Sequence, residues 1–223
     1  MTYTGSQLAS LRDLISRPRF QTYLRACGGD QVRAMRLYEW NLTASAAFMV
    51  PLQITEVALR NAVADAIVRT HGTDWPRNRG FRITLGQRRS QYKPDQDLDQ
   101  VVRRLDRSGG YSPGKAVAEL SFAFWQEMFT KRHDQAIWNA HLHAVLPNAP
   151  IPNVQAMRRW AFDEIGGVRR LRNRIAHHEP IIERDLGVDY DRIRDVASWR
   201  NPEAGIWIDR SSQVRDLLAA RPR

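Results

Sequence analysis

One long periodic segment, from Asp30 to Thr70, constrains the fold of this chain more than any other feature. Apolar residues recur along it at three- and four-residue steps, which is the spacing of one helix face. Asp30 is a good helix N-cap, and Gly72 is a typical stop. Pro51 lies inside the segment and removes a backbone donor, so we expect a kink or break there. The segment therefore predicts a very long helix, interrupted near its middle.

The rest of the chain also has the pattern of one helix after another. No alternation of apolar and polar residues is long enough to indicate a sheet, although residues 206–208 could form a short strand. We therefore predict an all-α fold, a helical bundle with an N-terminal helical extension and small C-terminal helices. Besides the long helix, the expected helices lie near residues 8–15, 16–27, 98–105, 113–129, 134–146, 153–179, 189–199 and 212–220.

Length and composition favour a single domain with a sizeable core. The chain has 223 residues, 43% hydrophobic, with seven tryptophans, which excludes a disordered chain. Without internal repeats or a linker, residues 1–223 are predicted to form one domain that ends in a C-terminal helical extension, 182–223. No window resembles a secretory signal or a membrane span, and the single Cys27 allows neither an internal disulfide nor a cysteine-based zinc site. We expect a cytoplasmic protein that does not enter a membrane.

The charge of the chain indicates a polyanionic partner. The net charge is +10 and the pI is near 10.5, which is unusual for a small cytosolic protein without such a partner. Nucleic acid is the first candidate, although charge alone predicts only non-specific affinity.

The stretch from Arg169 to Pro180 concentrates the residues that can do chemistry: four arginines, two histidines, an asparagine and a glutamate. It continues an amphipathic helix that begins near Asn153, a predicted N-cap. Because a proline disfavours helical geometry in the preceding residue, we expect Glu179 to be the last helical residue. The final turn would then contain two imidazoles next to free carbonyls and the negative end of the helix dipole, which favour protonated imidazole.

Within this stretch the spacing decides which side chains can cooperate. Asn173 and His177 project from nearly the same line, while Arg172 is set about 140° from His177 around the helix. A guanidinium, an amide and an imidazole could converge on a phosphodiester, where the imidazole moves protons and the guanidinium stabilises charge. The alternative is that the histidine only caps the helix C-terminus, which is the commoner role of such a residue.

Three blocks of the chain resemble those of a known family. Arg172-Asn-Arg-Ile-Ala-His177 has the arginine, polar residue, three spacers and histidine of the HEPN superfamily motif, and residues 171–181 are similar to the signature of the bacterial Abi-like (abortive infection) proteins. Residues 37–61 are similar to the first block of that family, and residues 119–125 to its middle block. The resemblance runs from about Phe20 to Ile181, and no departure occurs at the motif positions.

This resemblance implies a HEPN-type helical bundle and a metal-independent endoribonuclease of the abortive-infection or toxin type, without a cofactor. It implies attack by the ribose 2′-hydroxyl, with His177 moving protons, Arg172 stabilising the phosphorane and Asn173 orienting the histidine or a phosphate oxygen. It also implies a homodimer with the motif at the interface. Because a cell must restrain such an activity, we also expect an antitoxin, a modification or a phage-derived trigger that controls it. The alternative is a non-catalytic HEPN module that binds RNA or a partner protein as an infection sensor. His178 and Glu179 are secondary candidates.

Two further sets of residues are candidates for the site. Between Arg77 and Lys93 there are six basic residues and no acidic one, with Phe81 and Tyr92 among them, and we expect an exposed loop. It is either a solvated charge run or a surface on which aromatic rings stack on unpaired bases. The predicted RNA-binding set is Arg77, Arg79, Arg82, Arg88, Arg89, Lys93, Arg169, Arg170 and Arg174.

The second set is a polar strip, Glu56, Arg60 and Asn61, on the otherwise apolar long helix. It is either an internal salt bridge or a support for the motif arginine that also lines the site. We prefer the second interpretation, because the strip lies in one of the family-like blocks. We predict no metal site, since no cluster of carboxylate or cysteine residues is present.

Overall fold

The computed structural model describes residues 3–86 and 92–222, and within them the chain is all-α, as predicted. This part of the chain forms twelve α-helices, two 3-10 turns and one π-helical turn, and no strand. The helices are α1 (Gly5–Ile15), α2 (Arg17–Ala26), α3 (Gln31–His71), α4 (Arg79–Leu85), α5 (Pro94–Arg107), α6 (Pro113–Glu119), α7 (Phe122–Glu127), α8 (Asn139–Val145), α9 (Val154–Ala176), α10 (Leu186–Ser198), α11 (Pro202–Ser211) and α12 (Val214–Ala219).

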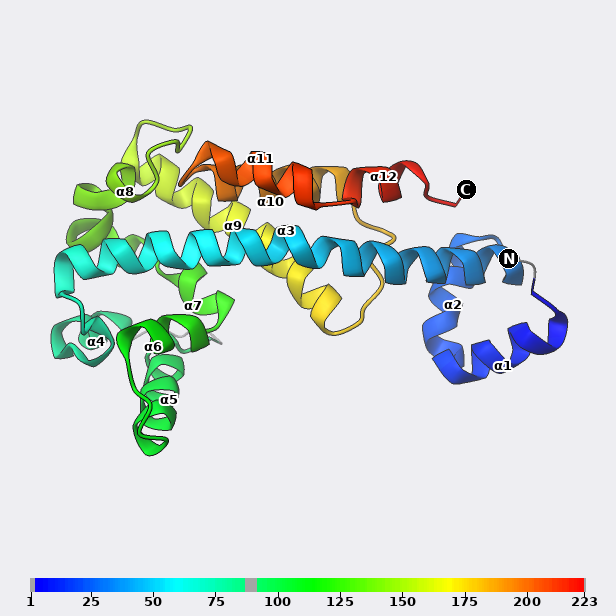
Figure 1. Ribbon diagram of the computed structural model, residues 1–223, viewed down its shortest axis with the longest axis horizontal. Helices are drawn as coiled ribbons and strands as arrows, with labels where there is room; N and C mark the ends of the chain where they lie inside the picture. Colours follow the sequence, from blue (N-terminus) through cyan, green and yellow to red (C-terminus); the bar gives the residue numbers. More distant parts are fainter. Residues whose placement is uncertain (1–2, 87–91, 223) are drawn as a thin grey trace.

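Helix α3 runs along the long axis of the molecule, with the other helices arranged around it (Figure 1). The Asp30 side chain accepts hydrogen bonds from the N–H groups of Val32 and Arg33, so the predicted N-cap is confirmed. The expected break at Pro51 is wrong: the helix continues through it, and Figure 1 shows no sharp kink. Pro51 is buried, and apolar packing on both sides holds the two halves in line although one backbone hydrogen bond is missing.

The C-terminal segment belongs to the bundle. Helix α10 packs against both α3 and α9, and the buried Thr55 hydroxyl of α3 donates a hydrogen bond of 3.0 Å to the carbonyl of Ile193. Helix α12 is held by the Trp40 indole, which donates to the carbonyl of Leu217 at 2.8 Å. Residues 206–208 lie inside α11, so the short strand considered for them is wrong. Helix α11 packs along α3 and α10, and this packing buries one face of α11, as in an amphipathic helix.

The expected loop after α3 is wrong for its described part. Residues 75–77 form a 3-10 turn, and α4 follows, capped by Asn78, whose side chain accepts from the N–H of Phe81. Trp75 and Phe81 are buried in edge contact with a centroid distance of 5.0 Å. Helix α4 is too short to produce a recognisable period, so burial of these rings is what forms it. Of the predicted RNA-binding residues, Arg88 and Arg89 lie outside the described residues.

The single helix expected at 113–129 is two helices. Leu120 is extended, with ψ 140°, and the Ser121 side chain accepts a hydrogen bond from the N–H of Phe124 to begin α7. This corner turns the aromatic residues of α7 into the core, where Phe124 and Trp125 are fully buried.

In the described residues one helix, α3, is long and apolar enough to cross a membrane, judged by length and composition alone. Core helices of soluble proteins meet the same measure. Here α3 buries Phe48, Leu52, Leu59 and Ile67 against the surrounding helices.

Candidate active site at the end of α9

Helix α9 carries the predicted motif and is built as an amphipathic helix. The side chain of Asn153 accepts from the N–H of Ala156 at 2.9 Å, so this predicted N-cap is confirmed. One face is buried in the core, where it removes apolar surface from water and sets the rotation of the helix. The buried apolar side chains of this face are Met157, Ala161, Ile165, Val168, Leu171 and Ile175.

The helix ends at Ala176, before Glu179, where the sequence led us to expect its end. His177 is the C-cap, and its N–H donates to the carbonyl of Asn173 at 2.9 Å. His178 follows in the left-handed region with φ 55°, and the N–H of Glu179 returns to the carbonyl of Arg174 at 2.7 Å. These hydrogen bonds form a Schellman-type helix end, in which the left-handed residue His178 reverses the direction of the chain. The helix therefore ends before it reaches the position where Pro180 would stop it. Glycine is the usual residue at such a position, and histidine is strained there.

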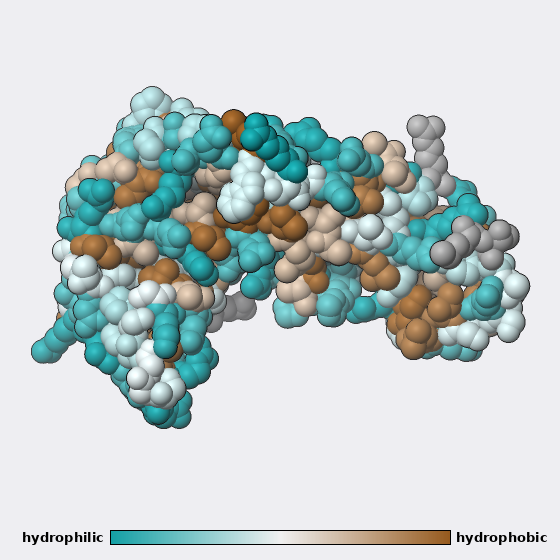
Figure 2. All heavy atoms as spheres, viewed as in Figure 1, coloured by the Kyte–Doolittle hydropathy of each residue, from teal (hydrophilic) through white to brown (hydrophobic). Residues whose placement is uncertain are grey.

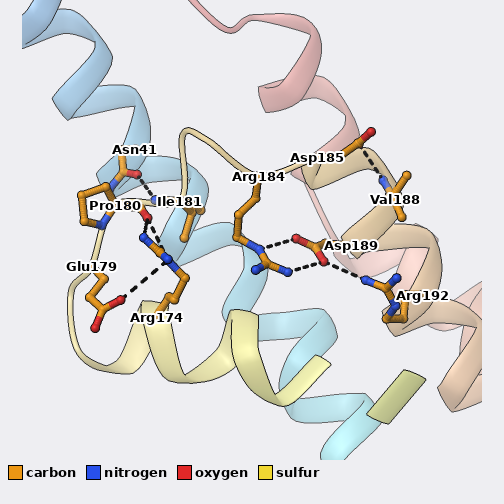
Figure 3. A network of polar contacts seen from close by, with 10 residues as sticks. All are labelled: Asn41, Arg174, Glu179, Pro180, Ile181, Arg184, Asp185, Val188, Asp189 and Arg192. Atoms are coloured by element: carbon orange, nitrogen blue, oxygen red, sulfur yellow. Dashed lines mark hydrogen bonds and ion pairs between the residues drawn. The ribbon is translucent and has the colours of Figure 1, made fainter. Parts of the chain in front are cut away.

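A network of polar contacts fixes the turn that follows α9 (Figure 3). The Arg174 guanidinium donates two hydrogen bonds to the carbonyl of Pro180, at 3.0 and 2.8 Å, and lies 3.7 Å from the Glu179 carboxylate. The buried Asn41 side chain of α3 accepts from the N–H of Ile181 at 2.9 Å. Arg174 and Glu179 therefore hold the turn, and the RNA-binding role predicted for Arg174 stays a prediction.

The network continues onto α10 through the buried carboxylate of Asp189. Arg184 pairs with it through two bonds of 2.6 and 2.7 Å, and this hydrogen bonding raises the pKa of the Arg184 guanidinium. Arg192 bonds to Asp189 at 3.0 Å and to Glu164 of α9 at 2.9 Å. Gly167 makes room for it, since a Cβ there would lie 2.7 Å from the Arg192 Cδ atom. Arg192 therefore pairs with a carboxylate on each of the two helices and links α10 to α9, the helix that carries the motif.

Arg172 projects toward α3, where it meets part of the predicted polar strip. Its Nε atom lies 3.7 Å from the Glu56 carboxylate, and its side chain is 41% exposed. Together with Arg60 these residues line a cavity of about 260 Å³. The Nε atom of Arg60 is buried and has no hydrogen-bond partner in the described part of the chain. The structure therefore brings together the motif arginine, a second arginine and one carboxylate.

The histidines lie apart from this cavity. His177 and His178 are exposed at the turn, and within the described residues neither imidazole makes a hydrogen bond or ion pair. Asn173 is half-buried, and neither Asn173 nor His177 lines the cavity of Arg172. The expected meeting of all three side chains at one anion is therefore not seen in the single chain. An offset of about 140° around the helix explains the separation.

The other predicted residues are scattered. Asn61 lines a second cavity, of about 430 Å³, between α3 and α6, which Arg60 lines as well, so Asn61 is the member of the polar strip that does not line the cavity of Arg172. Arg77 pairs with Asp106, and Arg82 with Asp99 at 2.5 Å, so both guanidinium groups are engaged within the chain. Phe81 is buried and cannot stack on a base, which overturns that interpretation for this ring. Arg79, Lys93 and Arg170 are exposed, and Arg169 is half-buried.

The sequence missed several residues that surround Arg172. Met49, Leu52, Gln53 and Val57 complete the cavity, and Gln53, Glu56, Val57 and Arg60 share one face of α3 at helical spacing. Their helical spacing from Glu56 is the sequence signal from which they could have been predicted. Asn41 carries no comparable signal, because its partner is the backbone of Ile181, far along the chain.

Among the described residues, no three histidine, cysteine, aspartate or glutamate side chains are grouped so that they could hold a metal ion. The polar residues of the cavity near α9 are instead two arginines, one glutamine and one glutamate, and the excess of positive charge suits an anion.

No protein-family model, curated protein or solved structure matches the chain. The resemblance to the HEPN superfamily and to Abi-like proteins therefore stays a prediction that rests on its three sequence blocks.

Proposed function

We propose that this protein is a metal-independent endoribonuclease of the abortive-infection type. The ribose 2′-hydroxyl attacks the adjacent phosphorus, and the bond to the 5′-oxygen breaks. His177 takes the hydroxyl proton, a proton is returned to the leaving oxygen, and Arg172 stabilises the charge on the phosphorane. Asn173 orients the imidazole or a phosphate oxygen. The products are a 2′,3′-cyclic phosphate and a 5′-hydroxyl.

One observation carries the proposal: a partly buried polar network holds an exposed turn that bears the motif. Arg174, Asn41 and the Asp189 cluster fix the backbone on both sides of His177, while the imidazole itself stays open to solvent. Arg172 lies in an open cavity and meets Glu56 only at 3.7 Å. Groups that are held in place but left open to a ligand are what catalysis by positioning requires.

The proposed partners are RNA and a second copy of the chain. Because Arg172 and His177 do not share the described cavity in one chain, we propose that two copies associate at the ends of α9 and complete one cleft. The expected location is the cytoplasm, where RNA substrates lie.

A non-catalytic RNA- or protein-binding module remains the alternative. The separation of Arg172 from His177 favours it, since binding needs the cation and the surface but no proton carrier. This alternative assumes the same fold and predicts that the protein binds RNA without cleaving it.

The deciding experiment compares cleavage by the wild type and by His177→Ala, in EDTA, on RNA and on DNA of the same sequence. The wild type should cleave only the RNA, and His177→Ala should lose roughly 10²–10⁴-fold in rate. His143→Ala is the matched control, because His143 is also exposed on a helix, α8, and should keep full activity. A well-folded, fully active His177→Ala would disprove the assignment, and an inactive wild type that binds RNA would favour the binding module.

A further inference from the structure

An apolar groove of about 480 Å³ lies between α3 and α11, beside the cavity that holds Arg172. Its walls are Val50, Ile54 and Val57 of α3 and Ala204 and Trp207 of α11. Figure 2 shows pale and brown side chains gathering between these two helices, surrounded by hydrophilic surface. A groove of this size and lining is typical of a binding site.

The groove is also where exposed apolar side chains concentrate. Of the eight large hydrophobic residues exposed in the described chain, Met49, Val50, Ile206 and Trp207 line the groove or the two cavities that adjoin it. Trp207 is 60% exposed. An indole so open to water costs free energy unless a ligand covers it, so the patch indicates a binding surface.

The charges around the groove indicate which class of ligand it can bind. Arg200 lines the groove itself and pairs with Asp65 at 2.7 Å, while Arg60 and Arg172 lie at one end, and Arg210 at the other, in a cavity that Glu203 also lines. Arg60 and Arg210 make no ion pair within the described residues. The chain as a whole has a net charge of +10, so a polyanion would be attracted to this surface. An open indole with arginines beside it is the arrangement that stacks an unpaired base and holds its phosphates.

The groove and the Arg172 cavity share a wall. Gln53 and Val57 line both, and they lie with Glu56 and Arg60 on one face of α3. A strand whose phosphate meets Arg172 and Arg60 therefore brings a neighbouring base to the groove. There the Gln53 amide and the Ser211 hydroxyl can hydrogen-bond to the base edge while Trp207 stacks on its face.

We propose that this groove binds an unpaired nucleobase of the RNA strand, next to the phosphate held by Arg172. The inference rests on the proposed ribonuclease function and names its substrate as single-stranded at this position. Trp207 is a binding residue here and takes no part in moving protons.

The test measures binding of a 2′-O-methyl RNA of about ten nucleotides, which cannot be cleaved, in about 50 mM salt by fluorescence anisotropy. Trp207→Ala should weaken binding about tenfold, and Trp207→Phe should restore most of it, because stacking on an aromatic ring contributes about 1–3 kcal/mol per base. Ala204→Phe, which fills the groove, should also weaken binding. The matched control is Ile206→Ala, the exposed neighbour that does not line the groove. With an abasic strand, wild type and Trp207→Ala should bind equally.

The outcomes separate the two proposals. If the wild type binds and cleaves RNA but Trp207→Ala does both equally well, the base site is wrong and the ribonuclease stands. If the wild type neither binds nor cleaves, the proposed function itself fails. If Trp207→Ala converts a dimer into a monomer in light scattering while RNA binding is unchanged, a second copy covers the groove and the base site is overturned.

Discussion

Two arginine-rich stretches of this chain have similar compositions and different structural roles. In residues 77–93, Arg77 and Arg82 pair with Asp106 and Asp99 of α5, and Phe81 is buried. In residues 169–174 of α9, Arg169 and Arg170 have no ion pair within the described chain, and Arg172 reaches a carboxylate only at 3.7 Å.

The difference lies in the supply of carboxylates by other helices. Helix α5 faces the first stretch with aspartates, which neutralise its guanidinium groups and make the stretch structural. Helix α3 faces the second stretch with one glutamate and a further arginine, so positive charge is left over for a phosphate. Charge runs in a sequence therefore indicate function only once their partners in the fold are known.

The largest expected effect comes from removing one arginine from each stretch. Arg172→Ala should lower RNA cleavage about 10²–10³-fold, the range seen when one donor to a developing charge is lost, with little change in unfolding free energy. Arg82→Ala should keep activity and lose about 0.5–1 kcal/mol of stability, since its pair with Asp99 is partly exposed. Initial cleavage rates and urea unfolding of both variants measure this. Equal loss of activity in both would remove the distinction between the stretches.

Glu56→Gln tests whether the pair in the second stretch is structural like those in the first. Removing the carboxylate frees Arg172 and adds one unit of positive charge to the cavity, so RNA affinity should rise about three- to tenfold at low salt, with a steeper salt dependence. Asp99→Asn is the matched control, because it adds the same unit of charge by freeing Arg82 and Arg103, away from the cavity, and should leave RNA affinity nearly unchanged. Weaker RNA binding by Glu56→Gln would mean that Glu56 is needed to position Arg172.

His178→Gly should show that the end of α9 is strained. A left-handed residue costs about 1–2 kcal/mol more for histidine than for glycine, and part of this is offset by the flexibility of glycine in the unfolded chain. We therefore expect a net gain of about 0.5–1 kcal/mol and a Tm increase of roughly 1–4 °C, measured by calorimetry. His143→Gly, in helical geometry on α8, should lose stability instead. A destabilised His178→Gly would show that the imidazole makes an interaction that stabilises the turn.

The smallest expected effect concerns His71, which packs on Phe81 of the first stretch with a centroid distance of 5.2 Å. Burial lowers the pKa of His71, so the folded protein resists protonation. The unfolded chain takes up a proton at the ordinary pKa, and stability is therefore lost as the pH falls below that value toward the folded pKa. In His71→Gln the unfolding free energy should fall less between neutral and mildly acidic pH than in the wild type. The same fall in both proteins would exclude His71 as the cause.

Local sequence signals predicted most of the helices but not all of the contacts between them. Asp30 and Asn153 were recognisable as N-caps because the capping residue and the first turn are neighbours in sequence. The loop expected between Arg77 and Lys93 was wrong over α4, and the break expected at Pro51 was wrong, because burial by distant residues outweighs local preference at both places. Two of the three residues of the predicted polar strip, Glu56 and Arg60, line the cavity of Arg172, and Arg60 also lines the second cavity together with Asn61.

The sequence by itself determined the all-α class, the helix that presents the motif and the excess of positive charge, because periodicity, caps and composition are local properties of the chain. The tertiary structure alone decided which arginines are neutralised, that Arg174 and Asn41 hold the turn after α9, and that Trp207 lies beside the Arg172 cavity. These depend on which helix faces join across long sequence separations, and such pairings follow from packing of the whole core rather than from any local pattern.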